Sequence, residues 1–181
     1  SSVPCMVGEV RLPHNADTGA RSVILGIACS DSVGGLSGRY PARKEQDLSD
    51  LWKAFEETHY IVHQKQPFTL RVGVHSPELD ALLKASGSDC AAFITAWNPM
   101  SRALSDSENN RRQQELMAEL DRRGLSYLPG IGQHPSNGWP GEESLLVLSL
   151  QLEAARSLAK DWEQLGFVWI ACGNPVRLML T

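Results

Sequence analysis

The sequence predicts an α/β fold, in which a mixed and partly parallel sheet is flanked by helices. Residues 90–101 form an apolar run that ends abruptly in a polar loop at Pro99, as expected for a strand that is buried on both faces. Residues 105–123 follow with helical spacing, so a strand, a tight loop and a helix N-terminus come in succession. Strands and helices continue to alternate towards the C-terminus, which is typical of helical crossovers between neighbouring strands.

Length and composition predict one domain. The chain has 181 residues, of which 42% are hydrophobic, and this is enough for one full core. Residues 1–46 are poor in large apolar side chains and are predicted to be a loosely ordered extension, in which the apolar run 23–29 could add an edge strand. Residues 47–181 are predicted to form the single α/β domain.

Charge and cysteine spacing exclude several classes of function. The formal net charge of −4 provides no overall attraction for nucleic acid or an anionic membrane, so neither partner is expected. No stretch approaches the roughly 18 apolar residues of a membrane-spanning helix, and we expect a soluble cytoplasmic protein. The cysteines lack any C-x-x-C pair and are expected to be reduced and structural, without a disulfide framework or a metal site. They are Cys5, Cys29, Cys90 and Cys172.

Two helices and one strand are predicted before the buried strand. Large apolar residues recur at helical spacing from residue 47 to about residue 59. Apolar and polar residues alternate over 68–74, which indicates a strand with one buried face. Ser76 and Pro77 then supply the N-cap and the first-turn proline of a short helix that closes at Gly87.

The helix after the buried strand begins with the capping-box spacing of Ser105 and Glu108 and ends before Gly124. A brief strand over 125–128 precedes a loop of about thirteen residues over 129–141, and loops of that length are more often functional than accidental. The remaining elements are a buried strand, an amphipathic helix and a C-terminal hairpin, over 144–150, 152–165, 167–172 and 176–180. The predicted order is therefore α-β-α-β-α-β-β-α-β-β.

One stripe of the long helix indicates where a site would lie. Asn109, Arg112, Leu116 and Leu120 follow 3-4-4 spacing and share one face. The aliphatic half of this face must cover the sheet, so Asn109 and Arg112 should lie under the loop at residues 97–98. A guanidinium near a helix N-terminus is unfavourable unless an anion lies beside it, and Glu142 or Glu143 could provide that charge.

Two interpretations of these residues compete. In the structural one, Arg112 pairs with Glu142, while Asn98 and Asn109 satisfy backbone groups of the loop. In the functional one, the same region binds a small anionic or nucleotide-like ligand, and Glu142 or Glu143 acts as an acid or base in hydrolysis or group transfer. The candidate ligand-binding residues are Trp97, Asn98, Ser101, Asn109, Arg112, Gly130, Trp139 and Ser144.

A third hypothesis is a non-catalytic interaction module, in which Trp97 and Trp139, if exposed, anchor a protein partner. Nothing in the sequence specifies a cofactor. Gly130-Ile-Gly132 lacks the third glycine of a dinucleotide fingerprint and does not open a helix. His59 and His63 have the spacing of a helical metal pair but no third ligand, so a surface pair is expected and no metal.

Four motifs of the chain occur in a fixed order, and they are Thr95-Ala-Trp-Asn-Pro99 with Ser101, Glu108-Asn109 with Arg112, Leu128-Pro-Gly-Ile-Gly132 and Trp139-Pro-Gly-Glu-Glu-Ser-Leu-Leu-Val147. In these motifs the chain resembles an uncharacterised bacterial family of proteins with a domain of unknown function (domain of unknown function 3293). Where such proteins often read Phe-Gly-Gln, this chain has Trp162-Glu163-Gln164. The resemblance implies no activity, and it marks the same loop residues that the stripe on the long helix indicates.

Overall fold

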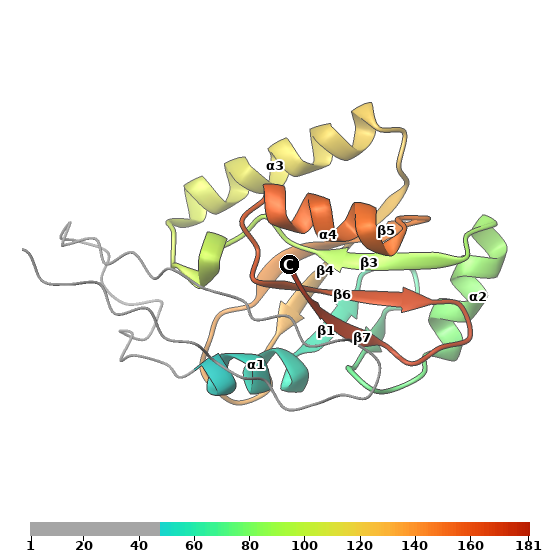
Figure 1. The fold of residues 1–181 in the computed structure, drawn as a ribbon, viewed down its shortest axis with the longest axis horizontal. Coiled ribbons are helices and arrows are strands. Elements are labelled where there is room, and N and C mark those ends of the chain that lie inside the picture. Colours follow the sequence, from blue (N-terminus) through green and yellow to red (C-terminus); the bar gives the residue numbers. More distant parts are fainter. Residues whose placement is uncertain (1–47) are drawn as a thin grey trace, which may run out of the picture. The chain divides into compact units, whose positions relative to one another are not determined.

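A computed structural model describes residues 48–181, which form a curled, entirely antiparallel sheet of seven strands with four helices (Figure 1). The strand order is β2-β1-β4-β5-β3-β6-β7. The predictions for residues 1–46, including Cys5, Cys29 and the strand at 23–29, lie outside the described residues. The elements are α1 (Leu48–Glu57), β1 (His59–Val62), β2 (Phe68–Leu70), α2 (Pro77–Ser86), β3 (Cys90–Ile94), the 3-10 turn η1 (Pro99–Ser101), α3 (Asp106–Arg122), β4 (Tyr127–Gln133), β5 (Glu142–Leu148), α4 (Leu152–Asp161), β6 (Gly166–Ala171) and β7 (Arg177–Leu180).

The prediction of a partly parallel sheet is wrong, because every neighbouring pair of strands is antiparallel. Helical crossovers do connect strands that run in the same direction, but a third strand lies between them. Helix α3 connects β3 to β4, and β5 lies between those two strands. Helix α4 connects β5 to β6, and β3 lies between them. The predicted α/β alternation is present from β3 to β6, but each crossover passes over an inserted antiparallel strand.

Several predicted boundaries are also corrected. The first hairpin was missed, since residues 59–62 are the strand β1, and β2 covers only the start of the predicted strand 68–74. Strand β4 runs on to Gln133, so the predicted long loop shrinks to residues 134–141. Glycine in a strand resembles a loop signal, but Gly130 lies under the Phe93 ring, where a Cβ atom would be 2.8 Å from Cε2 of that ring.

The predicted signals at the start of α3 and at both ends of α2 are confirmed, whereas α4 ends at Asp161 and not at the predicted residue 165. The Ser105 side chain accepts a hydrogen bond from the backbone N–H of Glu108, and the Glu108 carboxylate accepts one from the N–H of Ser105. Ser76 caps α2, and Gly87 ends it in a left-handed conformation with φ 68°. None of the helices within residues 48–181 is long and apolar enough to cross a membrane.

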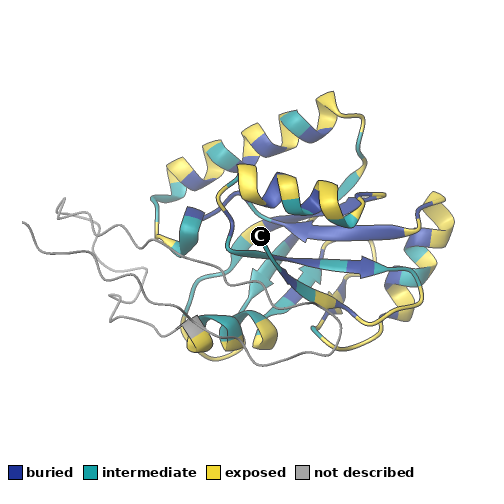
Figure 2. Ribbon diagram, viewed as in Figure 1, coloured by how far each residue is buried: buried dark blue, intermediate teal, exposed yellow. Residues whose placement is uncertain are grey.

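Two cores cover the two faces of the sheet. Strand β3 is buried along its whole length, as Figure 2 shows, and its side chains alternate between the two cores. Leu116 and Leu120 of α3 pack with α4 on one face. Helix α2 packs on the other face, where the sheet curls inwards.

The curl brings the two edges of the sheet together. The N–H of Gly73, just after β2, donates to the carbonyl of Val176, just before β7, across 2.8 Å. Tyr60 of β1 and Phe93 of β3 meet edge to face with ring centroids 5.4 Å apart, although β4 and β5 separate their strands. The concave side is therefore an enclosed interior that α2 fills at the end where β3 begins.

Candidate functional site

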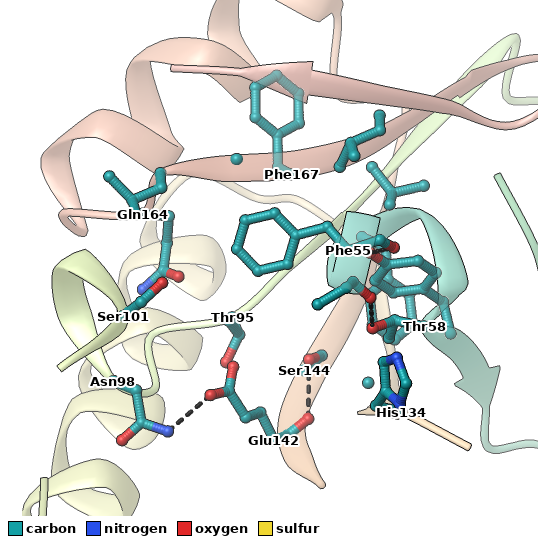
Figure 3. Close-up of a pocket in the computed structure, with 18 of the residues that line it drawn as sticks. Phe55, Thr58, Thr95, Asn98, Ser101, His134, Glu142, Ser144, Gln164 and Phe167 are labelled. Carbon is teal, nitrogen blue, oxygen red and sulfur yellow. Dashed lines mark hydrogen bonds between the residues drawn. The ribbon is translucent and has the colours of Figure 1, made fainter. Parts of the chain in front are cut away.

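A cavity of about 140 Å³ lies at the end of the concave interior where β3 finishes (Figure 3). Apolar side chains of the sheet and of α1 form most of its wall, including Phe55, Phe93, Phe167, Val168 and Leu178. Polar side chains also line the cavity, from the segments that follow β3 and β4 and from the start of β5, and among them are Thr95, Asn98, Ser101, His134, Asn137, Trp139, Glu142 and Ser144. The predicted residues Asn98, Ser101, Trp139, Glu142 and Ser144 thus meet at one cavity.

Among the described residues, Glu142 is the acidic group that lines this cavity. Its Oε1 accepts hydrogen bonds from Nδ2 of Asn98 at 2.6 Å and from Nε1 of Trp139 at 3.0 Å (Figure 3 shows the first). Burial raises the pKa of Glu142, because the charged carboxylate loses its hydration, and the two hydrogen bonds offset only part of this effect. The structure therefore holds a buried carboxyl group whose proton is retained to a higher pH than usual.

Glu143 does not line the cavity. It is exposed, and the strand places it on the opposite face from Glu142 and Ser144, because successive side chains of β5 alternate. Only its backbone takes part, since its carbonyl accepts a hydrogen bond from Oγ1 of Thr95 at 2.6 Å. Of the two carboxylates that the sequence suggested as catalytic, the geometry brings only Glu142 into the candidate site.

Asn98 is held by Asn109, as the helical stripe predicts. The backbone N–H of Asn98 donates to Oδ1 of Asn109 at 2.9 Å, and Nδ2 of Asn109 donates back to Oδ1 of Asn98 at 2.9 Å. The N–H of Leu104 also donates to Oδ1 of Asn98. Asn109 itself is fully buried and does not touch the cavity, so it positions Asn98, which in turn contacts Glu142.

The loop beside the cavity has an unusual backbone. Asn98, Met100 and Ser101 have φ values of 47°, 51° and 52°, a region that side-chain-bearing residues rarely adopt. The hydrogen bonds to Asn98 and a 2.7 Å bond from the N–H of Met100 to the carbonyl of Glu163 hold this conformation. Backbone strain of this kind is concentrated at functional sites, and Asn98 and Ser101 both line the cavity.

Arg112 lies under the loop as predicted but does not reach Glu142. Its Nε donates to the carbonyl of Ala96 at 2.9 Å, and one terminal nitrogen donates to the carbonyl of Trp162 at 3.0 Å. The other terminal nitrogen is 3.5 Å from Oε2 of Glu163. The suggested pairing with Glu142 is thereby corrected, and Arg112 joins the loop after β3 to the end of α4.

Replacing Arg112 by alanine is expected to lower the free energy of unfolding by about 1.5–3 kcal/mol, because two carbonyls lose a charged donor. The matched control is Arg111→Ala on the adjacent, exposed position, where only an ion pair with Glu115 is lost and a change within about 0.5 kcal/mol is expected. Urea denaturation of both variants measures the difference. Equal effects would contradict the assigned role of Arg112.

The tryptophans of the two loops are not exposed anchors. Trp97 is only 8% exposed and does not line the cavity, and its Nε1 has no hydrogen-bond partner among the described residues. Trp139 is half-buried, and its indole nitrogen donates to Glu142. Gly130 is buried beneath Phe93 and likewise does not touch the cavity.

Several lining residues were missed in the sequence. Thr95 is part of the Thr-Ala-Trp-Asn-Pro segment and could have been found there, whereas Gln164 lies beyond the end of α4. The Nε2 of Gln164 donates to the carbonyls of Trp97 and Trp162. Phe55 and Tyr60 carried no local signal, because only the curl of the sheet brings them to this cavity.

Among the lining residues of the described chain, no side-chain hydroxyl group forms a hydrogen bond with a histidine. No cysteine, lysine or arginine of residues 48–181 lines the cavity. The Nδ1 of His134 accepts hydrogen bonds from the N–H groups of Ser136 and Asn137, and its Nε2 is 3.3 Å from Glu57, so this ring does not activate Ser144. Ser144 Oγ instead donates to the carbonyl of Glu142 at 3.0 Å. The arrangement places one carboxyl group, Glu142, where it can accept or release a proton at the cavity.

Residues 94–166, which include α3 and most of the cavity loops, match a family described as "Protein of unknown function (DUF3293)". The resemblance that the sequence motifs suggested is therefore confirmed for this segment. No curated protein and no solved structure matches the chain at a significant level.

Proposed function

We propose that this chain, similar over its central segment to a family of unknown function, binds a small molecule in the cavity and fixes one polar group of that molecule at Glu142. The observation that carries the proposal is a buried carboxyl group, oriented by Asn98 and Trp139, at a cavity whose wall is otherwise mostly apolar. Apolar pockets with a few oriented polar groups are the usual form of a small-molecule site. The hydrogen bonds between Asn109 and Asn98 support the proposal, since they hold Asn98 in the position from which it orients the carboxyl group of Glu142.

The size of the cavity favours a compact ligand. At about 140 Å³ it is close to an engineered cavity of about 150 Å³ that holds benzene. Pockets for larger ligands such as nucleotides usually have about 300–1,000 Å³. The geometry therefore supports a ligand with a body about the size of one six-membered ring rather than the nucleotide that the sequence suggested.

Gly132 offers a direct test, because it lines the cavity and the nearest atom of the described residues to a Cβ there would be Cγ2 of Thr58, at 3.7 Å. In a fragment screen by ligand-observed NMR, we expect hits that bind the wild type and are lost in Gly132→Val, whose side chain fills the space. Asn110→Ala, an exposed change outside the lining, is the control and should retain all hits. Hits that survive in Gly132→Val would contradict the proposed location.

A second candidate function is proton transfer by Glu142, which its raised pKa favours, because a general acid or base works best with a pKa near the working pH. The variant Glu142→Gln separates the two functions. A proton-transfer enzyme keeps ligand affinity in this variant and loses turnover, whereas a binding protein that depends on the carboxylate loses affinity.

The raised pKa of Glu142 also predicts how the stability of the protein depends on pH. Its pKa in the folded protein lies above the unfolded value of about 4.3, so its contribution is most favourable below that value and is lost as the pH rises through the folded pKa. We expect Glu142→Gln to become progressively more stable than the wild type as the pH rises through this range. The exposed change Glu143→Gln should show no such trend. Thermal denaturation as a function of pH measures both, and parallel curves for the wild type and Glu142→Gln would count against a buried charge.

A further inference from the structure

The side-chain donors around the cavity are almost all used within the protein. Four hydroxyl groups of the lining donate to backbone carbonyls. The hydroxyl of Thr58 donates to Ala54 and that of Tyr60 to Phe55. The hydroxyl of Thr95 donates to Glu143 and that of Ser144 to Glu142. The Nε2 of Gln164 donates to two further carbonyls. Within residues 48–181, Ser101 and Asn137 are the lining residues whose side-chain donors no hydrogen bond uses, and Asn137 is exposed.

Acceptors, in contrast, remain available. Both hydrogen bonds to the carboxyl group of Glu142 go to Oε1, so Oε2 accepts none from the part of the chain that the structure describes. A hydroxyl group that donates to a carbonyl retains its lone pairs, so Ser144, on the same face of β5, adds a second acceptor. Most side-chain donors at the cavity are thus already hydrogen-bonded within the protein, whereas Oε2 of Glu142 and Oγ of Ser144 can still accept. Such a lining is complementary to a ligand that brings hydrogen-bond donors.

The charge of the lining also favours a ligand that brings donors, because it is negative. Glu142 is its acidic residue, and no lysine or arginine of the described chain lines the cavity to compensate it. Arg112, which the sequence suggested as an anion-binding group, instead donates hydrogen bonds to the carbonyls of Ala96, after β3, and of Trp162, after α4. An anion would therefore meet the Glu142 carboxylate, whereas a cation would supply a counter-charge that no described lining residue provides.

The rest of the cavity suits the body of such a ligand. Tyr60 and Phe93 meet edge to face, and Phe55 and Phe167 add two more rings (Figure 3 labels the latter pair). Aromatic faces attract cations as well as apolar groups, so they tolerate an ammonium group at one end and a hydrocarbon body at the other.

We propose that the ligand is a small amine, bound as the ammonium cation, with its nitrogen at Oε2 of Glu142 and a compact aromatic or cyclic aliphatic body against the phenyl rings. This inference rests on the proposed function and specifies the class of its ligand. It replaces the anionic ligand that the sequence alone suggested.

The ion pair makes affinity depend on pH. The ammonium group of an alkylamine titrates near the lysine value of about 10.4, so it stays charged at neutral pH. Glu142 must lose its proton to pair with it, and affinity therefore rises as the pH rises through the pKa of this carboxyl group. Within residues 48–181, the other titratable groups that line the cavity are Tyr60 and His134, and the latter is paired with Glu57.

The test compares benzylamine, benzyl alcohol and benzoate, which share one ring and differ in charge, in NMR titrations of the full chain at about pH 5 and about pH 8. We expect benzylamine to bind about tenfold more tightly than the other two probes at the higher pH. We expect this preference to weaken at the lower pH, to disappear in Glu142→Gln and to persist in Glu143→Gln, the exposed neighbour.

The possible failures are distinguishable. If benzoate or benzyl alcohol bound as tightly as benzylamine at the higher pH, the inference of an amine ligand would be wrong, and the proposed binding site in the cavity would be unaffected. A preference for benzylamine that survives in Glu142→Gln would also overturn the assignment of its nitrogen. If none of the three probes shifts resonances of the residues that line the cavity, the proposed function fails and the amine inference fails with it.

Discussion

Gly130→Ala is expected to lower the free energy of unfolding by about 2–3 kcal/mol, because the strand leaves no space for one methyl group. A Cβ atom at this position would lie 2.6 Å from the carbonyl oxygen of Ile61 and 2.8 and 2.9 Å from two atoms of the Phe93 ring. The carbonyl belongs to the neighbouring strand β1 and cannot move without disturbing the pairing of β1 with β4. Urea denaturation measures the loss.

Gly132→Ala is the matched control for this prediction. Gly132 lies two residues further along the same strand and on the same face, but a Cβ atom there would be 3.7 Å from its nearest neighbour in the part of the chain that the structure describes. We expect a change within about 0.5 kcal/mol of the wild type. A similar loss in both variants would indicate that the penalty comes from strand propensity and not from the contact with Ile61 and Phe93.

Asn109→Ala is expected to lower the free energy of unfolding by about 2–4 kcal/mol, since it leaves buried polar atoms without partners. The backbone N–H of Asn98 loses its acceptor, and Oδ1 of Asn98 loses one of its donors. Because Asn98 has a left-handed backbone that these bonds support, the loop beside the cavity should also loosen. Chemical denaturation measures the loss, and the titration with benzylamine should show weaker binding.

The neighbouring residue supplies the control here as well. Asn110 is exposed on the same helix, so Asn110→Ala removes the same side chain without removing a buried partner, and a change within about 0.5 kcal/mol is expected. If the two variants had equal stability, the pair of hydrogen bonds between Asn98 and Asn109 could not be what holds the loop.

The part of the site that could be predicted from the sequence is the part that depends on local periodicity. A helix with Asn109 and Arg112 on the same stripe as Leu116 and Leu120 must turn the polar pair towards the sheet, wherever the sheet lies. The structure confirms this orientation through the bonds to Asn98 and Ala96. The capping box and the glycine that ends α2 are local in the same sense and were also correct.

The sequence by itself thus determined the helices, the loop at Asn98 and the side chains beneath it. These features follow from the spacing of apolar residues, with a period of 3.6 in a helix and two in a strand, and this spacing can be read within a few neighbouring residues. Only the tertiary structure decided that the sheet is antiparallel, since insertion of β3 between β5 and β6 depends on contacts far apart in the chain. It also decided that Glu142 and not Glu143 faces the cavity, because a strand alternates its side chains but the pattern of two adjacent glutamates does not say which face is inside. Finally, the curl of the sheet brought α1 and Tyr60 to the same cavity, and no local signal marks a contact that depends on the curvature of seven strands.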